Sequence, residues 1–289
     1  MLILSVLSIP MFALGVELMY RGVKIGSPYF IALISILPEL ILTIESSMRS
    51  NYYVALSTVL GSVVSLYVIG ISFFGIVHFL RWKSHFKVGK QREFPFIVVT
   101  SLLLGLLPLF GRLDFLWGII FLILFLFYSA IKMTSTKINA RAIPSLLAGG
   151  LIIWFSSGWL LQDIFSISSA FHIPPYYVAV FIVPIMSNIQ EISTAFRSKK
   201  ENVMREFLLG VINENVMAST LLLAIIGFAS GINGVELNYL NPMIEISFLV
   251  GTLAYVLVKN GEIRLSDSLI MILGLLLFIS QFYGKFIIL

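Results

Sequence analysis

The chain has 289 residues, of which 59% are hydrophobic and only 11% charged, and its net charge is +5. One soluble core of this length cannot bury so much apolar surface, which excludes a soluble globular protein and indicates a membrane protein. The absence of cysteine excludes disulfide bonds and thiol chemistry.

Long apolar runs recur along the whole chain, each near or above the roughly 20 residues that a helix needs to cross a bilayer. They predict an all-α, polytopic membrane protein with ten transmembrane helices and no soluble domain. In chain order, the predicted spans are 2–20, 28–48, 52–80, 95–111, 114–131, 144–162, 174–196, 203–230, 241–258 and 265–284.

The second predicted span carries Glu39, with Pro38 before it and Ser35 four residues before it. The third span places Ser62 twenty-three residues after Glu39. Because proline removes a backbone donor and clashes with the preceding turn, Pro38 is expected to break its helix and free carbonyl oxygens. A carboxylate at mid-membrane depth costs roughly 2.5 to 3.5 kcal/mol on insertion scales and by default marks an ion or substrate site.

The seventh predicted span repeats this pattern. Glu191 lies 152 residues after Glu39, with Ser187 four residues before it and Pro184 as the expected helix break. Glu214, in the eighth span, follows Glu191 by twenty-three residues. A duplicated pattern of this kind predicts one ion site built from two halves of the chain.

The basic residues predict the orientation of the spans. If the N-terminus is outside, all Lys and Arg residues except Arg49, Arg112 and Lys285 fall in cytoplasmic loops, as the positive-inside rule requires. Both termini are therefore expected to be extracellular, in the plasma membrane, and residues 1–138 and 139–289 are expected to form two inverted five-helix repeats. Topology explains the positive charge, so no nucleic-acid partner is expected.

Both repeats resemble the α-repeats of the calcium/cation antiporter superfamily, which includes sodium/calcium and calcium/proton exchangers. The segment 37–40, Leu-Pro-Glu-Leu, is similar to the family's Ser-Leu-Pro-Glu signature, and Gly61-Ser62 is similar to its Gly-Ser element. The spacing from Pro175 to Glu191 also fits the family. The resemblance implies a ten-helix antiporter rather than an enzyme, with the bilayer and transported cations as partners and no cofactor.

The resemblance, together with the chemistry of the side chains, implies a set of oxygen ligands. Ca²⁺ takes roughly six to eight oxygens, and two carboxylates match its charge, so Glu39 and Glu191 are the expected metal ligands. The expected cation-binding residues are Glu39, Glu191, Glu214, Ser35, Ser62, Ser187, Asn188 and Asn215.

The chain departs from the family at several ligand positions. Leu66 and Ala218 stand where the family has an asparagine and an acidic residue, whereas Glu214 stands where it has serine. Because a buried glutamate can take up a proton, this exchange of ligands favours protons slightly over sodium as the counter-ion for calcium. A cation channel, a non-transporting scaffold and a membrane-embedded hydrolase are the alternatives, and the transported ion, stoichiometry and oligomeric state stay open.

Overall fold

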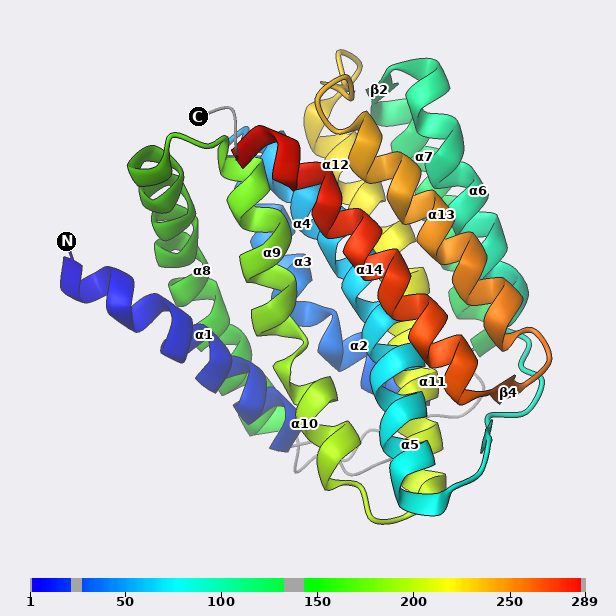
Figure 1. Ribbon diagram of the computed structural model, residues 1–289. Coiled ribbons are helices and arrows are strands. Elements are labelled where there is room, and N and C mark those ends of the chain that lie inside the picture. The colour runs from blue at the N-terminus through cyan, green and yellow to red at the C-terminus, as the bar shows by residue number, and fades with distance from the viewer. Residues whose placement is uncertain (1, 22–27, 133–142, 287–289) are drawn as a thin grey trace.

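The computed structural model describes residues 2–21, 28–132 and 143–286, which form a bundle of long helices (Figure 1). The helices of the first half are α1 (Leu2–Arg21), α2 (Pro28–Ser35), α3 (Leu37–Met48), α4 (Tyr52–Tyr67), the π-helix η1 (Val68–Phe73), α5 (Phe74–Trp82), α6 (Phe94–Phe110) and α7 (Phe115–Lys132). Those of the second half are α8 (Ile143–Phe171), α9 (Pro175–Ser187), α10 (Ile189–Arg197), α11 (Glu201–Met217), the π-helix η3 (Ala218–Leu222), α12 (Leu223–Ser230), α13 (Asn241–Val258) and α14 (Leu265–Phe286).

A helix, or a run of consecutive helices, lies in each apolar range that the sequence predicts to span the membrane. Among the described residues, six helices are long and apolar enough to cross a membrane, and there are seven if the bent pair α9 and α10 forms one span. Shorter apolar helices occupy Leu7–Met19, Phe94–Phe110 and Leu265–Ser280. The molecule is therefore an integral, mostly helical membrane protein, and the count of ten crossings stays a prediction.

Two spans are interrupted beside the repeated glutamates. Ile36 separates α2 from α3, two residues before Pro38, although Pro28–Met48 is still one apolar span of 21 residues. In the second half, α9 and α10 meet at Asn188 and are bent by 43°. Pro184 lies inside α9, so this break follows the proline by one turn.

Both long central helices contain a π-helical segment near mid-length. The first joins α4 to α5 through η1, and the second joins α11 to α12 through η3. Each π segment begins within two turns after a residue of the repeated pattern, Ser62 in α4 and Glu214 in α11. Short π segments inside α-helices are frequent at functional sites, because the wider turn changes which side chains face a neighbour.

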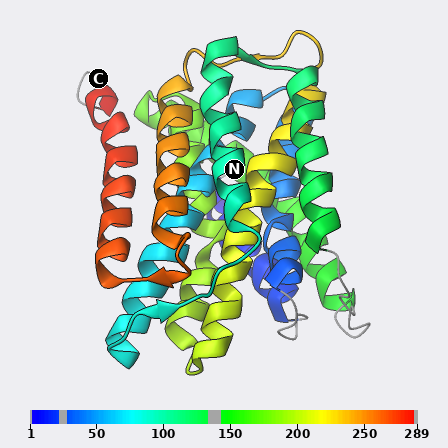
Figure 2. The ribbon, with the colours of Figure 1, turned by 90° about the vertical axis from the view of Figure 1, so that its right-hand side faces the viewer.

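The helices of the two halves are packed against one another throughout the bundle. α4 packs on α9, α2 on α11, α6 on α13 and α1 on α8, so each of these contacts joins one half to the other. Helices α13 and α14 lie side by side in both views (Figures 1 and 2). A central site between the halves is therefore enclosed by α2, α3, α4, α9, α10 and α11.

Two short antiparallel strand pairs also join the halves. β1 (Phe86–Lys87) pairs with β4 (Glu262–Ile263), and β2 (Arg112–Leu113) pairs with β3 (Val235–Glu236). β2 and β4 lie at opposite ends of the bundle in Figure 1. Each pair therefore connects a loop of one half to a loop of the other, one pair at each end of the molecule.

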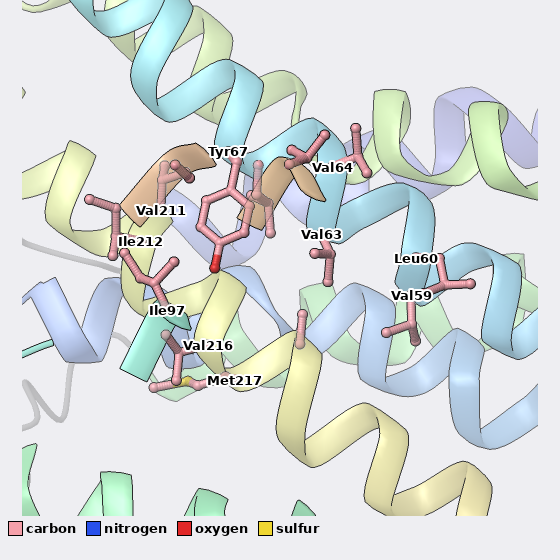
Figure 3. Close-up of a cluster of buried hydrophobic side chains, with 14 of the residues drawn as sticks. Val59, Leu60, Val63, Val64, Tyr67, Ile97, Val211, Ile212, Val216 and Met217 are labelled. Atoms are coloured by element: carbon pink, nitrogen blue, oxygen red, sulfur yellow. The ribbon is translucent and has the colours of Figure 1, made fainter. Parts of the chain in front are cut away.

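Buried apolar side chains fill the space between α4 and α11. Tyr67 is buried among valine, leucine and isoleucine side chains of these two helices, with Ile97 of α6 beside it (Figure 3). Outward-facing positions of α7, α8 and α14 are also apolar, and Leu116, Leu151 and Leu277 are each at least 60% exposed. An apolar exterior around a packed core is the surface that a lipid environment requires.

Candidate cation site

The two repeated glutamates lie in the core, beside the interruptions of their helices. Glu39 is in the first turn of α3 and Glu191 is in the first turn of α10. Their exposed fractions are 0% and 2%, so both carboxyl groups are removed from solvent. Burial of an acidic group at this depth is costly unless a cation, a proton or hydrogen-bond donors compensate for it.

Glu39 is hydrogen-bonded by serines from both halves of the chain. Its Oε1 atom accepts from the Oγ of Ser62 on α4 at 2.5 Å and from the Oγ of Ser187 at the end of α9 at 2.8 Å. Ser62 belongs to the same half as Glu39, whereas Ser187 belongs to the other half. The first glutamate is therefore held at the boundary between the two halves.

Glu191 is held in the matching way. Its Oε1 atom accepts from the Oγ of Ser35, the last residue of α2, at 3.0 Å. Ser35 and Ser187 are separated by 152 residues, as are Glu39 and Glu191. Each half thus contributes one serine to the glutamate of the other half, and the two contacts are related by the internal repeat.

Glu214 is a third buried carboxyl group at this site. It lies on α11 with 1% of its surface exposed, and its side chain is hydrogen-bonded to Ser35. Glu191 and Glu39 are close enough to repel its negative charge. Three acidic side chains from α3, α10 and α11 therefore share one buried region.

Two asparagines add amide groups at the same level. The Nδ2 of Asn188 donates to the Oγ of Ser65 at 3.0 Å and to the carbonyl of Pro184 at 2.8 Å. The Nδ2 of Asn215 donates to the carbonyl of Val63 at 2.7 Å. These bonds fix both amide planes, with the nitrogen atoms directed to α4 and to the end of α9.

Several buried oxygen atoms at the site have no hydrogen-bond donor among the described residues. They are Oε2 of Glu39, Oε2 of Glu214, Oδ1 of Asn188 and Oδ1 of Asn215. An unpartnered buried acceptor destabilises a fold by about 1 to 3 kcal/mol, and a cation removes that cost by accepting the lone pair. Carboxylate and amide oxygens are the ligands that hard cations such as Ca²⁺ prefer.

The carboxyl groups do not converge on a single point. Across the described residues, no group of three or more His, Cys, Asp or Glu side chains is arranged to hold one metal ion. A cation bound here would therefore take oxygens from one or two glutamates and complete its shell with hydroxyl, amide and backbone oxygens.

The carbonyl released by Pro184 faces a neighbouring helix. A proline has no N–H, so Val180, four residues earlier, loses its helical donor. A Cβ atom added at Gly61 of α4 would lie 2.2 Å from the Val180 oxygen, so α4 and α9 touch there through their backbones. The sequence predicts a free carbonyl beside the glutamate. In the structure, the Val180 carbonyl lies against the backbone of Gly61.

All eight residues expected to bind a cation are buried, and the serines contact the glutamates as described above. The sequence did not single out Ser65, which accepts from Asn188 and donates to the carbonyl of Ser62 at 3.1 Å. The spacing of three residues from Ser62 places it on the same helix face and is the signal that identifies it. Leu66 and Ala218 are buried without adding an oxygen ligand.

The aspartates that a membrane-embedded hydrolase would have to pair lie in or directly before three different helices, and each has a partner of another kind. Asp114 accepts from two backbone N–H groups at the start of α7, and Asp163 accepts from the hydroxyl of Ser8. Asp267 accepts from the backbone N–H of Arg264 at 2.8 Å. These contacts cap or join helices, so none of the three is placed beside another aspartate.

Comparison with known proteins gives one family. The model of the family described as sodium/calcium exchanger protein matches residues 4–134 and 142–284. No curated protein sequence gives a significant match.

Three solved structures have similar folds. The H⁺/Ca²⁺ exchanger CAX aligns with a TM-score of 0.82 and 16% identity, over 97% of this chain and 81% of that chain. Native YfkE aligns with a TM-score of 0.71 and 17% identity, over 96% and 89%. The sodium-calcium exchanger NCX_Mj, soaked with Na⁺ and Ca²⁺, aligns with a TM-score of 0.61 and 20% identity, over 96% and 94%. Because these sequence identities are low, the three alignments show a similar fold and do not by themselves show a similar function.

Proposed function

Because this chain belongs to the sodium/calcium exchanger protein family, we propose that it is a secondary antiporter that exchanges calcium, or a related cation, for protons or sodium. Glu39 and Glu191 bind the transported cation, the three serines and the two asparagines supply further oxygens, and Glu214 binds the returning counter-ion beside them. The cation is cargo rather than a resident cofactor, and the family is one of membrane exchangers.

The reciprocal hydrogen bonds between the halves support this proposal most directly. Ser187 donates to Glu39 and Ser35 donates to Glu191, so each carboxylate accepts a hydrogen bond from a serine of the opposite half. A relative movement of the two halves changes both oxygen clusters together. Alternating access requires such a coupling between cation coordination and the position of the halves.

Exchange rather than one-way release follows from the charges at the site. Glu39, Glu191 and Glu214 are buried together, so removal of the bound cation leaves like charges in a region that solvates them poorly. That arrangement opposes the conformational change until another cation or protons enter. The return step therefore carries the counter-ion, which couples the two opposite fluxes.

Glu214 favours protons as the counter-ion. It replaces a neutral serine of the family pattern with a group that a proton can neutralise, while Leu66 and Ala218 remove two oxygen ligands that sodium ions need. The similar structures do not discriminate, since CAX is described as an H⁺/Ca²⁺ exchanger and NCX_Mj as a sodium-calcium exchanger. The ligand set of this chain is thus the basis for preferring protons.

Residues 1–138 and 139–289 form, in this proposal, two inverted repeats with five spans each. At the repeat offset, α4 corresponds to α11 and α2 corresponds to α9. The packing of α4 on α9 is therefore the counterpart of the packing of α11 on α2, which supports the repeat. The strand pairs at opposite ends of the bundle support it in the same way. The distribution of Lys and Arg supports an orientation with both termini outside the cell, and the proposal assigns the protein to the plasma membrane.

Reconstitution into liposomes tests the function. Calcium efflux is measured under an imposed pH gradient without sodium, and then under a sodium gradient with the pH clamped on both sides. We expect saturable calcium flux that requires one of these counter-ions. Calcium flux that neither the pH gradient nor the sodium gradient changes, or that fails to saturate, contradicts exchange and favours a channel.

A further inference from the structure

Hydroxyl side chains continue from Glu39 along one face of α3 to the end of that helix. Thr43, Ser46 and Ser47 follow the glutamate by four, seven and eight residues, which is the spacing of side chains on a single helix face. Each is at most 4% exposed. None of their hydroxyl oxygens has a hydrogen-bond partner among the described residues.

The neighbouring helix presents a fourth hydroxyl of the same kind. Thr58 on α4 lies one turn before Ser62, is fully buried and has no hydrogen-bond partner in the described part of the chain. α3 and α4 are packed together and joined by only three residues, so they are antiparallel. Because Ser62 contacts Glu39, the residues one turn nearer the connection, Thr43 and Thr58, lie at the same depth.

Most buried hydroxyls in the described helices have a hydrogen-bond partner, and besides the four named above only Ser129 and Thr252 in these helices lack one. Ser and Thr side chains in helices commonly donate to a carbonyl in the preceding turn, and Thr100 and Thr220 do so here. A buried polar group without a partner lowers the stability of the folded state. Four such groups side by side, adjoining a buried carboxylate, form a row of neutral oxygens that can replace part of the hydration shell of a cation.

The row is only partly repeated in the other half, where Ser198 and Lys199 stand at the positions of Ser46 and Ser47. At the repeat offset of 152, the counterparts of Thr43 and Thr58 are Ala195 and Gly210, neither of which has a side-chain oxygen. A Cβ atom added at Gly210 would lie 2.9 Å from Ile31, so α11 is packed closely against α2 there. The two hydroxyls nearest Glu39, those of Thr43 and Thr58, are thus specific to the side of the α3–α4 connection.

We propose that Thr43, Ser46, Ser47 and Thr58 form the access path by which a cation passes between Glu39 and the end of the molecule at residues 49–51. The path rests on the proposed exchange function, and that end is extracellular in the predicted topology. Neutral hydroxyls bind a cation weakly enough for it to move on, whereas Glu39 retains it.

Substitution by valine tests the path, because valine keeps the branched shape of threonine and removes only the hydroxyl. In Thr43→Val/Thr58→Val, we expect calcium uptake from the extracellular side to fall at least tenfold in right-side-out vesicles. The thermal midpoint should stay unchanged or rise, since no hydrogen bond is lost. Thr100→Val, whose hydroxyl is bonded to helix carbonyls, is the control and should retain wild-type uptake.

Cysteine accessibility gives a second measurement that does not depend on transport. The chain has no cysteine, so Thr43→Cys, Thr58→Cys and the control Thr100→Cys each carry a single thiol. The impermeant reagent 2-(trimethylammonium)ethyl methanethiosulfonate, applied outside, should modify the first two at least tenfold faster than the control. Equal rates for all three, or full uptake by the double valine variant, overturn the path. If the first two cysteines are modified fast but the protein shows no exchange, the access path is supported and the proposed exchange function is contradicted.

Discussion

The two carboxylate oxygens of Glu39 have different hydrogen-bond environments. Oε1 accepts from Ser62 and Ser187, while Oε2 has no donor among the described residues. The serines therefore orient the group without neutralising it. A cation can be bound by the second oxygen while the first stays fixed, which separates the positioning of the carboxylate from its binding function.

Replacement of the repeated glutamates by glutamine removes charge and preserves shape. We expect Glu39→Gln and Glu191→Gln each to lower calcium exchange by roughly a hundredfold or more, because the remaining oxygens cannot balance a divalent charge. Both variants should still be monodisperse in detergent by size-exclusion chromatography. The flux assay in liposomes measures the effect.

Glu245→Gln is the matched control, since Glu245 lies on α13 with an exposed side chain. It should exchange calcium at the wild-type rate. Near-normal flux in Glu39→Gln or in Glu191→Gln would remove these two residues from the site.

The replacement Glu214→Ala addresses the counter-ion. If Glu214 takes up the returning proton, the variant should lose most of the calcium flux that a pH gradient drives, by about tenfold or more. Glu214→Gln keeps the size of the side chain and should show the same loss. Strict sodium dependence in the wild type, with no response to the pH gradient in any variant, would reduce Glu214 to a hydrogen-bonding partner of Ser35.

The residues of the site could be found from sequence because both copies of one pattern are present. The offset of 152 identifies Glu39 with Glu191 and Ser35 with Ser187 without any structure. The hydrogen bonds that cross between the halves could not be found, since each joins residues about 150 positions apart. Those contacts depend on how α2 approaches α10 and α9 approaches α3, which no local pattern specifies.

Among the secondary-structure elements, the contact of α4 with α9 imposes the strictest spacing. The carbonyl of Val180 has no helical donor, because Pro184 lacks an N–H group. Gly61 lies against this carbonyl, and a Cβ atom at Gly61 would lie 2.2 Å from its oxygen. A backbone cannot give way as a flexible side chain does. We therefore expect Gly61→Ala to separate the two helices that carry Ser62 and Ser187.

This separation should destabilise the protein by about 1 to 3 kcal/mol and abolish exchange. Gly150→Ala is the control, because nothing lies within 4 Å of a Cβ added there. Thermal unfolding in detergent should show a lower midpoint for Gly61→Ala and an unchanged or slightly higher one for Gly150→Ala. Equal midpoints and equal fluxes for the two variants would contradict the close contact.

Helices could be predicted more completely than their irregularities. Runs of apolar residues mark the ten helical ranges, since hydropathy is a property of the local sequence. The π segments η1 and η3 and the short strand pairs have no such signal, because the first contain ordinary apolar residues and the second have only two residues a strand. Pro184 indicates a break in the seventh span, yet the bend occurs at Asn188, where α9 and α10 meet.

At the scale of the whole molecule, the continuous run α4–η1–α5 provides a test of orientation. It extends from Tyr52 to Trp82, so Asn51 and Ser84 lie beyond its opposite ends. In the proposed topology, Asn51→Cys should react with an impermeant maleimide from outside, and Ser84→Cys only after the cytoplasmic face is opened. A tag placed after Leu289 should be accessible from outside.

The cysteine-free wild type gives the background in this experiment. Labelling of Asn51→Cys and Ser84→Cys from the same side would exclude a membrane crossing between them. Labelling of Ser84→Cys and the tag from the same side would refute the ten-span arrangement.

The hydrogen bonds that Ser35 and Ser187 make across the halves also limit how the two repeats of this chain can diverge. Ser35 and Ser187 each donate a hydrogen bond to the glutamate of the opposite half. A mutation of either serine therefore removes a hydrogen bond from the glutamate of the other repeat. Selection then acts on both copies at once and opposes their divergence. Ser62 bonds within its own half and is free of this constraint, and its counterpart is Glu214, a different residue. The two serines whose bonds cross in the same way have thus stayed identical, whereas Ser62 and Glu214 have diverged both in residue type and in partner, since Glu214 is bonded to Ser35 of the other half.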